Sequence, residues 1–165
     1  MMLKGNKISL RKATEEDALN IVRWRNQDFI KKNFIVQATL TVEGHLKWMK
    51  ENVETGHVVQ MIIIENETND PIGSVYLRDI DYNEKTAEYG IFIGEKRWQG
   101  KGYGSEACKM ICDYAKEKMG LQKLFLRLKD FNIPALKSYE NAGFVLTGEY
   151  EYVNDEKIIF MEKIL

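Results

Sequence analysis

The sequence of 165 residues contains no apolar run close to the roughly 18 residues of a membrane-spanning helix. Residues 1–6 lack the apolar core of a secretory signal, so we expect a cytoplasmic protein. Two histidines and two cysteines leave few metal ligands, and we expect no metal. The formal net charge of −1 provides no basic field, so we expect neither nucleic acid nor a membrane as a partner.

The two cysteines, Cys108 and Cys112, lie four residues apart on the apolar face of a predicted helix. A C-x-x-x-C pair without a nearby histidine is not a zinc pattern, and its helical geometry is poor for a disulfide. We therefore predict that both thiols are free and belong to the core.

Hydrophobic residues make up 44% of the chain and charged residues 30%, which indicates one globular domain over residues 1–165. Periodicity, helix caps and turn residues predict an alternation of strands and helices. The predicted strands are 8–12, 58–65, 72–80, 86–93, 123–128, 144–152 and 157–165. Four helices are predicted. The first ends near residue 26, the second covers 41–54, the third follows a glycine-rich turn and ends near 119, and the fourth covers 133–142.

The glycine-rich turn, residues 99–105, reads Gln-Gly-Lys-Gly-Tyr-Gly-Ser and links a predicted strand to a predicted helix. Alternating glycines let the main chain approach a bulky ligand, and the start of a helix attracts anions. A dinucleotide fingerprint would need glycine at Ser105, and a nucleotide-triphosphate P-loop would need Ser or Thr at Gly102. The turn therefore predicts a phosphate or pyrophosphate site of another kind.

A second motif, residues 132–144, reads Asn-Ile-Pro-Ala-Leu-Lys-Ser-Tyr-Glu-Asn-Ala-Gly-Phe. Together the two motifs resemble the GNAT superfamily of acyl-CoA-dependent N-acetyltransferases, with its Q-x-x-G-x-G and N-x-x-A-x-x-x-Y-E-x-x-G-F patterns. The resemblance implies an α/β (α+β) fold with a twisted, mainly antiparallel mixed sheet and about four flanking helices. In this fold the fourth and fifth predicted strands splay apart to admit the pantetheine arm.

The resemblance also implies acetyl-CoA as co-substrate. Main-chain amides of the glycine turn would bind its diphosphate, with side-chain contacts from Gln99 and Lys101. The edge of strand 86–93 would pair with pantetheine amides, and one N–H there would polarise the thioester carbonyl. The cofactor-binding residues so implied are Ile91, Phe92, Ile93, Gln99, Gly100, Lys101, Gly102, Tyr103, Gly104, Ser105 and Asn132.

Catalytic roles follow from the chemistry of acetyl transfer to an amine. Tyr139 occupies the position of the family tyrosine that donates a proton to the leaving sulfur, a step that a phenol can perform at neutral pH. The acceptor amine must lose a proton, and Glu88 is the best candidate base. His45 and Glu84 are the alternatives.

The acceptor is indicated by shorter segments, Arg-Trp-Arg-Asn at 23–26 and His-Leu-Lys-Trp at 45–48. They are similar to two GNAT groups, acetyltransferases of ribosomal-protein N-termini and of amino-sugar nucleotides. We expect direct attack in a ternary complex, with a nucleotide-linked amino sugar preferred. Arg25, Asn26 and His45 are the predicted substrate-binding residues, Arg25 suiting phosphate.

Other interpretations stay open. The acceptor can be a peptide or a polyamine, although a polyamine site should contain acidic residues. Arg23 and Lys31 are alternatives for the phosphate contact. A CoA-binding regulatory domain without turnover is the alternative from another class, and a homodimer is possible in any of these cases.

Overall fold

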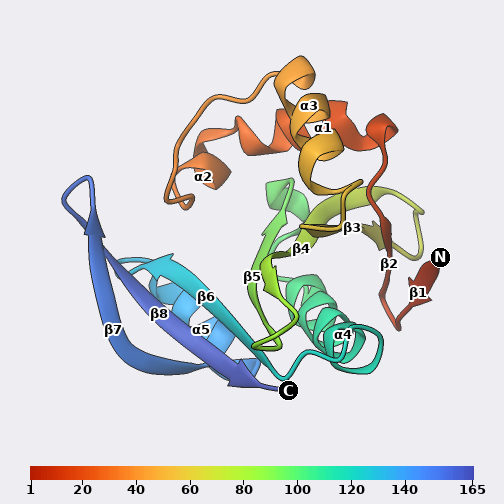
Figure 1. Cartoon of the computed structure of the whole chain (residues 1–165). Helices are drawn as coiled ribbons and strands as arrows, with labels where there is room; N and C mark the ends of the chain where they lie inside the picture. Colours follow the sequence, from red (N-terminus) through yellow and green to blue (C-terminus); the bar gives the residue numbers. More distant parts are fainter.

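The computed structural model describes residues 1–165, and its eight strands form one mixed sheet (Figure 1). The sheet order is β1-β2-β3-β4-β5-β6-β8-β7, and only the β5–β6 pair is parallel. This confirms the predicted fold. The strands are β1 (Met2–Lys4), β2 (Ile8–Lys12), β3 (Val59–Glu65), β4 (Pro71–Asp81), β5 (Thr86–Ile93), β6 (Lys123–Lys129), β7 (Val145–Val153) and β8 (Glu156–Ile164).

The helices differ little from the predicted ones, with one short addition. They are α1 (Ala18–Arg25), α2 (Asp28–Lys31), α3 (Val42–Asn52), α4 (Tyr103–Glu117) and α5 (Ile133–Asn141), with 3-10 turns at Glu15–Asp17 and Lys96–Trp98. Polar caps fix where helices begin: the Thr41 hydroxyl accepts from Gly44 N at 3.0 Å, and Asn132 Oδ1 accepts from Ala135 N at 3.4 Å.

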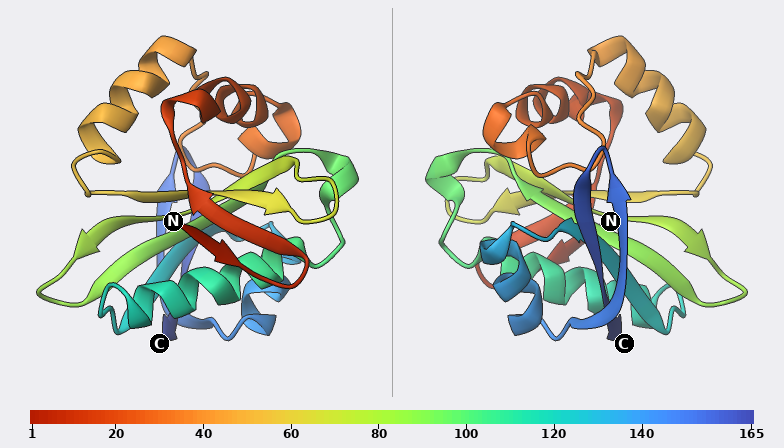
Figure 2. Two further views of the ribbon diagram at one scale, coloured as in Figure 1. Left: turned by 90° about the vertical axis from the view of Figure 1, so that its right-hand side faces the viewer. Right: turned by 90° about the vertical axis from the view of Figure 1, so that its left-hand side faces the viewer.

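Helices cover both faces of the sheet, with α4 and α5 on one face and α1, α2 and α3 on the other (Figure 2). Because side chains alternate along a strand, β3 sends Met61 and Ile63 to the α4 face and Ile62 and Ile64 to the α1 face. All four are buried, which explains why β3 is a continuous apolar run.

The pairing in the middle of this sheet, between β5 and β6, is short. β5 pairs with β4 along its length, from Thr86 to Ile93. With β6 it shares only three residue pairs, which join 86–88 to 123–125. Beyond Glu88 the two strands diverge (Figure 1), and this is the splay predicted for the fourth and fifth strands.

Cys108 and Cys112 are free and buried beneath the sheet, 3% and 5% exposed, as predicted for core residues. No helix is both long and apolar enough to cross a membrane. No group of three or more His, Cys, Asp or Glu side chains gathers where it could hold a metal ion.

Candidate active site

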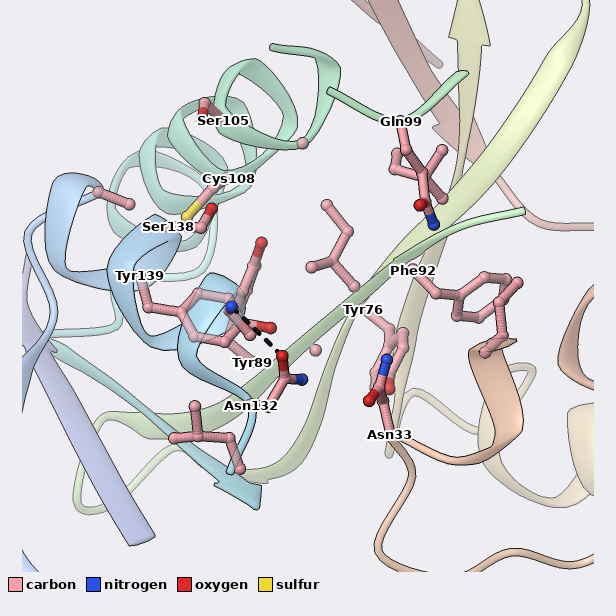
Figure 3. A pocket seen from close by; sticks show the side chains of 18 of the residues that line it. Asn33, Tyr76, Tyr89, Phe92, Gln99, Ser105, Cys108, Asn132, Ser138 and Tyr139 are labelled. Carbon is pink, nitrogen blue, oxygen red and sulfur yellow. Dashed lines mark hydrogen bonds between the residues drawn. The ribbon is translucent and has the colours of Figure 1, made fainter. Parts of the chain in front are cut away.

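A cavity of about 460 Å³ opens where β5 and β6 diverge. Its walls come from β4, β5, β6, the glycine turn, the first turns of α4, α5, and α2 with the segment after it (Figure 3). Segments far apart in the sequence therefore meet in one concave site.

The glycine turn forms one end of the cavity. Gly100 and Gly102 have φ values of +72° and +82°, a left-handed conformation that favours glycine. Gly104 has no such conformation, and a Cβ placed there would meet only Ile91 Cδ1, at 3.8 Å. The protein's own packing therefore does not require glycine at 104. The open room before the first amides of α4 fits a diphosphate.

The edge of β5 that faces the cavity has unused backbone groups. Since β6 pairs with β5 only as far as Glu88, the N–H and C=O groups of residues 89–93 that point toward β6 have no strand partner. Ile91, Phe92 and Ile93 all line the cavity. This edge can pair with the amides of an extended ligand, as the pantetheine prediction requires.

We expect Gly104→Ala to weaken CoA binding tenfold or more, which is about 1.4 kcal/mol, while the protein stays as stable as the parent. The added methyl group would occupy the room in front of the α4 amides, and in the free protein it would make only an ordinary van der Waals contact with Ile91. Titration calorimetry with CoA and urea denaturation measure the two quantities. Unchanged CoA affinity would contradict a diphosphate site at this turn.

Tyr139 projects from α5 into the other end of the cavity (Figure 3). Its ring packs edge-on against Tyr89, with centroids 6.0 Å apart, and against Phe144 at 6.0 Å. Its hydroxyl makes no hydrogen bond within the chain. Burial raises the pKa of this hydroxyl above its usual value, so it remains a proton donor at neutral pH.

Glu88 lies in the cavity wall and is 2% exposed. Its Oε1 accepts from Arg78 at 2.9 Å and from Arg127 at 3.0 Å, and Arg127 also pairs with Glu151 at 3.3 Å. Burial alone would raise the pKa of Glu88, but the two arginines outweigh it and the pKa is lowered. Glu88 is thus a weaker base than a free glutamate.

The arginine pairing of Glu88 predicts a pH-dependent effect of Glu88→Gln. A lowered pKa means that the ion pairs stabilise the fold above the unfolded-state pKa, and that this stabilisation disappears as pH falls through the folded-state value. We expect the free energy of unfolding of the variant to be about 2 kcal/mol lower at pH 7. The loss is modest because both arginines are partly exposed to water, which screens the ion pairs. Denaturation from pH 7 to 3 should show this gap closing below pH 4.5; a constant gap would contradict the ion-pair explanation.

The predicted substrate-binding residues do not line the cavity. The Asn26 amide holds the loop before α3, since Nδ2 donates to the Leu40 carbonyl at 2.9 Å and Oδ1 accepts from the Leu40 N–H at 2.8 Å. His45 is 6% exposed and stacks on Trp48, with centroids 5.5 Å apart. The Arg25 guanidinium lies 3.9 Å from the ring centroid of Phe34, which does line the cavity.

Ten of the eleven predicted cofactor residues line the cavity, the exception being Lys101. Of the alternative bases and cations, Glu84 lies in the exposed turn between β4 and β5, and Arg23 is exposed with Glu95 3.7 Å away. Lys31 donates to the Thr39 hydroxyl at 2.8 Å. None of these three lines the cavity.

Sequence reasoning missed several polar and aromatic residues of the cavity wall. Register places Tyr76 opposite Gly90 and Arg78 opposite Glu88, so these side chains share the sheet face that α1 and α3 cover. A side chain at Gly90 would overlap the Tyr76 ring. The sequence contains only two signals of this arrangement. A tyrosine and an arginine lie two positions apart in β4 and so share one face, and a glycine interrupts β5. Other missed residues of the wall include Asn33, Phe34 and Arg127.

Comparisons with a family model, with curated proteins and with solved structures show what this chain is similar to. A family model described as an acetyltransferase (GNAT) domain matches residues 7–145. An uncharacterized protein of Methanocaldococcus jannaschii is 31% identical over 87% of this chain, and the match spans 29% of the length of that relative. Among solved structures, spermidine N-acetyltransferase of Vibrio cholerae in complex with CoA and spermine has a TM-score of 0.88 and 22% identity, covering 97% of this chain and 96% of that one.

A second solved structure, RimL, a ribosomal L7/L12 alpha-N-protein acetyltransferase in complex with coenzyme A, has a TM-score of 0.86 and 17% identity, covering 100% of this chain and 98% of that one. One of these structures is thus described with a bound polyamine, and the other is named as an acetyltransferase of a ribosomal protein. The fold alone therefore does not select the acceptor.

Proposed function

We propose that this chain, which belongs to the GNAT family and is an acyl-CoA-dependent N-acetyltransferase, passes acetyl directly from acetyl-CoA to a primary amine in a ternary complex. The observation that carries the proposal is the cavity itself. It joins a turn fit for a diphosphate, a free edge of β5 and the hydroxyl of Tyr139. Cys108, the thiol in the wall, is 3% exposed and too enclosed to receive the acetyl group and pass it on.

Two side chains on opposite sides of the cavity, Tyr139 and Glu88, carry out the proton transfers. Tyr139 donates a proton toward the departing sulfur from the α5 side. From the other side, Glu88 Oε2, which makes no hydrogen bond within the chain, accepts the proton of the amine directly or through water. Because Arg78 and Arg127 keep the pKa of Glu88 low, the amine must itself be easy to deprotonate.

The acceptor we propose is a small-molecule or peptide amine. The nucleotide-linked amino sugar expected from the short segments near Arg25 and His45 has no support among the relatives. A polyamine is the acceptor class that the Vibrio cholerae structure suggests, and a protein N-terminus is the one suggested by RimL. All three belong in one assay.

Thiol release from acetyl-CoA tests the function. The panel contains a nucleotide-linked amino sugar, spermidine, an aminoglycoside and a peptide with a free N-terminus. Release with any one of them supports the proposed transfer and identifies its acceptor class. CoA binding without release from any amine would favour the regulatory domain.

We also propose that a second copy of the chain covers β7. This strand lies at the edge of the sheet and exposes four large apolar side chains. They are Val145, Leu146, Tyr150 and Tyr152, each more than half exposed. Light scattering of the purified protein gives the oligomeric state; a monomer at high concentration would contradict this interface.

A further inference from the structure

Arg25 is a cation without a counter-ion. It sits at the end of α1, partly buried, and no carboxylate lies within ion-pair distance and no hydrogen bond engages its guanidinium. Its Nε is buried without an acceptor. The guanidinium instead lies over the ring of Phe34, with Cζ 3.9 Å from the ring centroid. A buried charge of this kind is costly unless something pairs with it.

A second arginine nearby, Arg78, also has an Nε without an acceptor. Arg78 pairs with Glu88 through one terminal nitrogen, but its Nε is also buried without an acceptor. Burial lowers the pKa of Arg25, and Arg78 lowers it further by its like charge, with Tyr76 opposing both. Both arginines act on the Tyr76 hydroxyl by their charge, and this hydroxyl makes no hydrogen bond within the chain.

Two buried arginine donors on this side of the cavity therefore have no acceptor within the chain. Arginine Nε only donates, and its planar fork suits phosphate and carboxylate. The carboxylates near the wall, Glu88 and Glu151, are already paired with Arg78 and Arg127. The cavity lining contains no other acid, so Arg25 leaves an uncompensated positive charge behind Phe34 and Tyr76.

We infer that the acceptor amine carries an anionic group, phosphate or carboxylate, that Arg78 binds this group beside the Tyr76 hydroxyl, and that Arg25, behind the Phe34 ring, attracts it by its charge. This inference rests on the proposed function and names the substrate class of its site. The same positive charges favour the neutral form of a bound amine, which is the reactive form. They disfavour a polycationic acceptor such as a polyamine.

Matched pairs of amines provide the test by thiol release. Glucosamine is compared with glucosamine 6-phosphate for the phosphate source, and alaninamide with alanine for the carboxylate source, with spermidine as the polycation. We expect the kcat/KM of one anionic member to exceed that of its neutral partner at least tenfold. A higher kcat/KM for spermidine, or no preference in either pair, would overturn the inference.

Variants separate binding from folding. In Arg25→Met the KM of the preferred anionic amine should rise at least tenfold, with the KM of acetyl-CoA unchanged and the melting temperature no lower. Arg23→Met is the matched control, since Arg23 is in the same helical turn, half-exposed and near Glu95, and its KM values should stay at those of the parent. Equal loss on charged and neutral amines in Arg25→Met would overturn the inference.

A binding measurement keeps this result apart from the fate of the proposed function. With CoA saturating, glucosamine 6-phosphate or alanine should raise the melting temperature of the parent and raise that of Arg25→Met less. Absence of thiol release from every amine contradicts the proposed function alone. Equal melting shifts in parent and variant, or no shift in either, contradict the anion site.

Discussion

Replacing Tyr139 with Phe should lower kcat about 100-fold, because a positioned general acid contributes on the order of that factor or more. The phenylalanine ring keeps the edge-on contacts with Tyr89 and Phe144, so the cavity retains its shape. CoA affinity should therefore remain within about twofold of the parent, a change far below the roughly 1.4 kcal/mol of a tenfold effect. Thiol-release kinetics and titration calorimetry with CoA measure the two effects.

Tyr89→Phe is the matched control for this substitution. Tyr89→Phe also removes a tyrosine hydroxyl from the cavity wall. However, Tyr89 is only 4% exposed, and no catalytic role is predicted for its side chain on β5. Its kcat should change by less than about threefold, a small fraction of the general-acid effect. If both variants lose activity equally, or if Tyr139→Phe keeps full turnover, Tyr139 is not the proton donor.

Gly73→Ala should destabilise the fold by about 3 kcal/mol, at the upper end of overpacking effects. Gly73 lies in β4 opposite Ile93, and a Cβ there would overlap the carbonyl oxygen of Phe92 and lie 3.1 Å from the Ile93 Cα. Backbone atoms cannot move aside without shifting β5. The same shift would displace the edge that we expect to pair with pantetheine, so CoA affinity should fall as well.

Urea denaturation and calorimetry test the Gly73 substitution, with Gly104→Ala as the contrasting variant. Gly73 pairs with Ile93 of the cavity wall and Gly104 lines the cavity itself, but the Cβ at 104 meets Ile91 Cδ1 only at 3.8 Å. Gly104→Ala should lose CoA affinity alone, whereas Gly73→Ala should lose both properties. A destabilisation below about 1 kcal/mol at Gly73 would mean that β5 yields to the methyl group more easily than its packing suggests.

Local signals explain which parts of the fold could be predicted from the sequence. Thr41 and Asn132 cap helices through side chains that contact the backbone three residues on. Asn154 and Asp155, both with positive φ, fix the β7–β8 turn that the sequence indicates. Each of these depends on a few adjacent residues. The glycine motif is of the same kind, and it lies at the end of the cavity where we expect the cofactor.

Long-range pairing explains what could not be predicted. Glu88 accepts from Arg127, which is 39 positions later and reaches it only because β6 pairs in parallel with β5. No local pattern gives that register, so the low pKa of Glu88 could not be read from the sequence. Asn26 looked available for substrate, but the loop that folds back to Leu40 takes both of its amide groups.

Because the β5–β6 ladder is only three residue pairs long, we expect the sheet to behave as two cooperative blocks, joined by these pairs and by shared packing against α4. In the free protein, amide hydrogens of β6, β7 and β8 can exchange with solvent through partial opening that leaves the other five strands intact. A ligand that spans the gap couples the blocks, because it binds only when both are folded. Binding of the acetyl donor would thus merge two unfolding units into one.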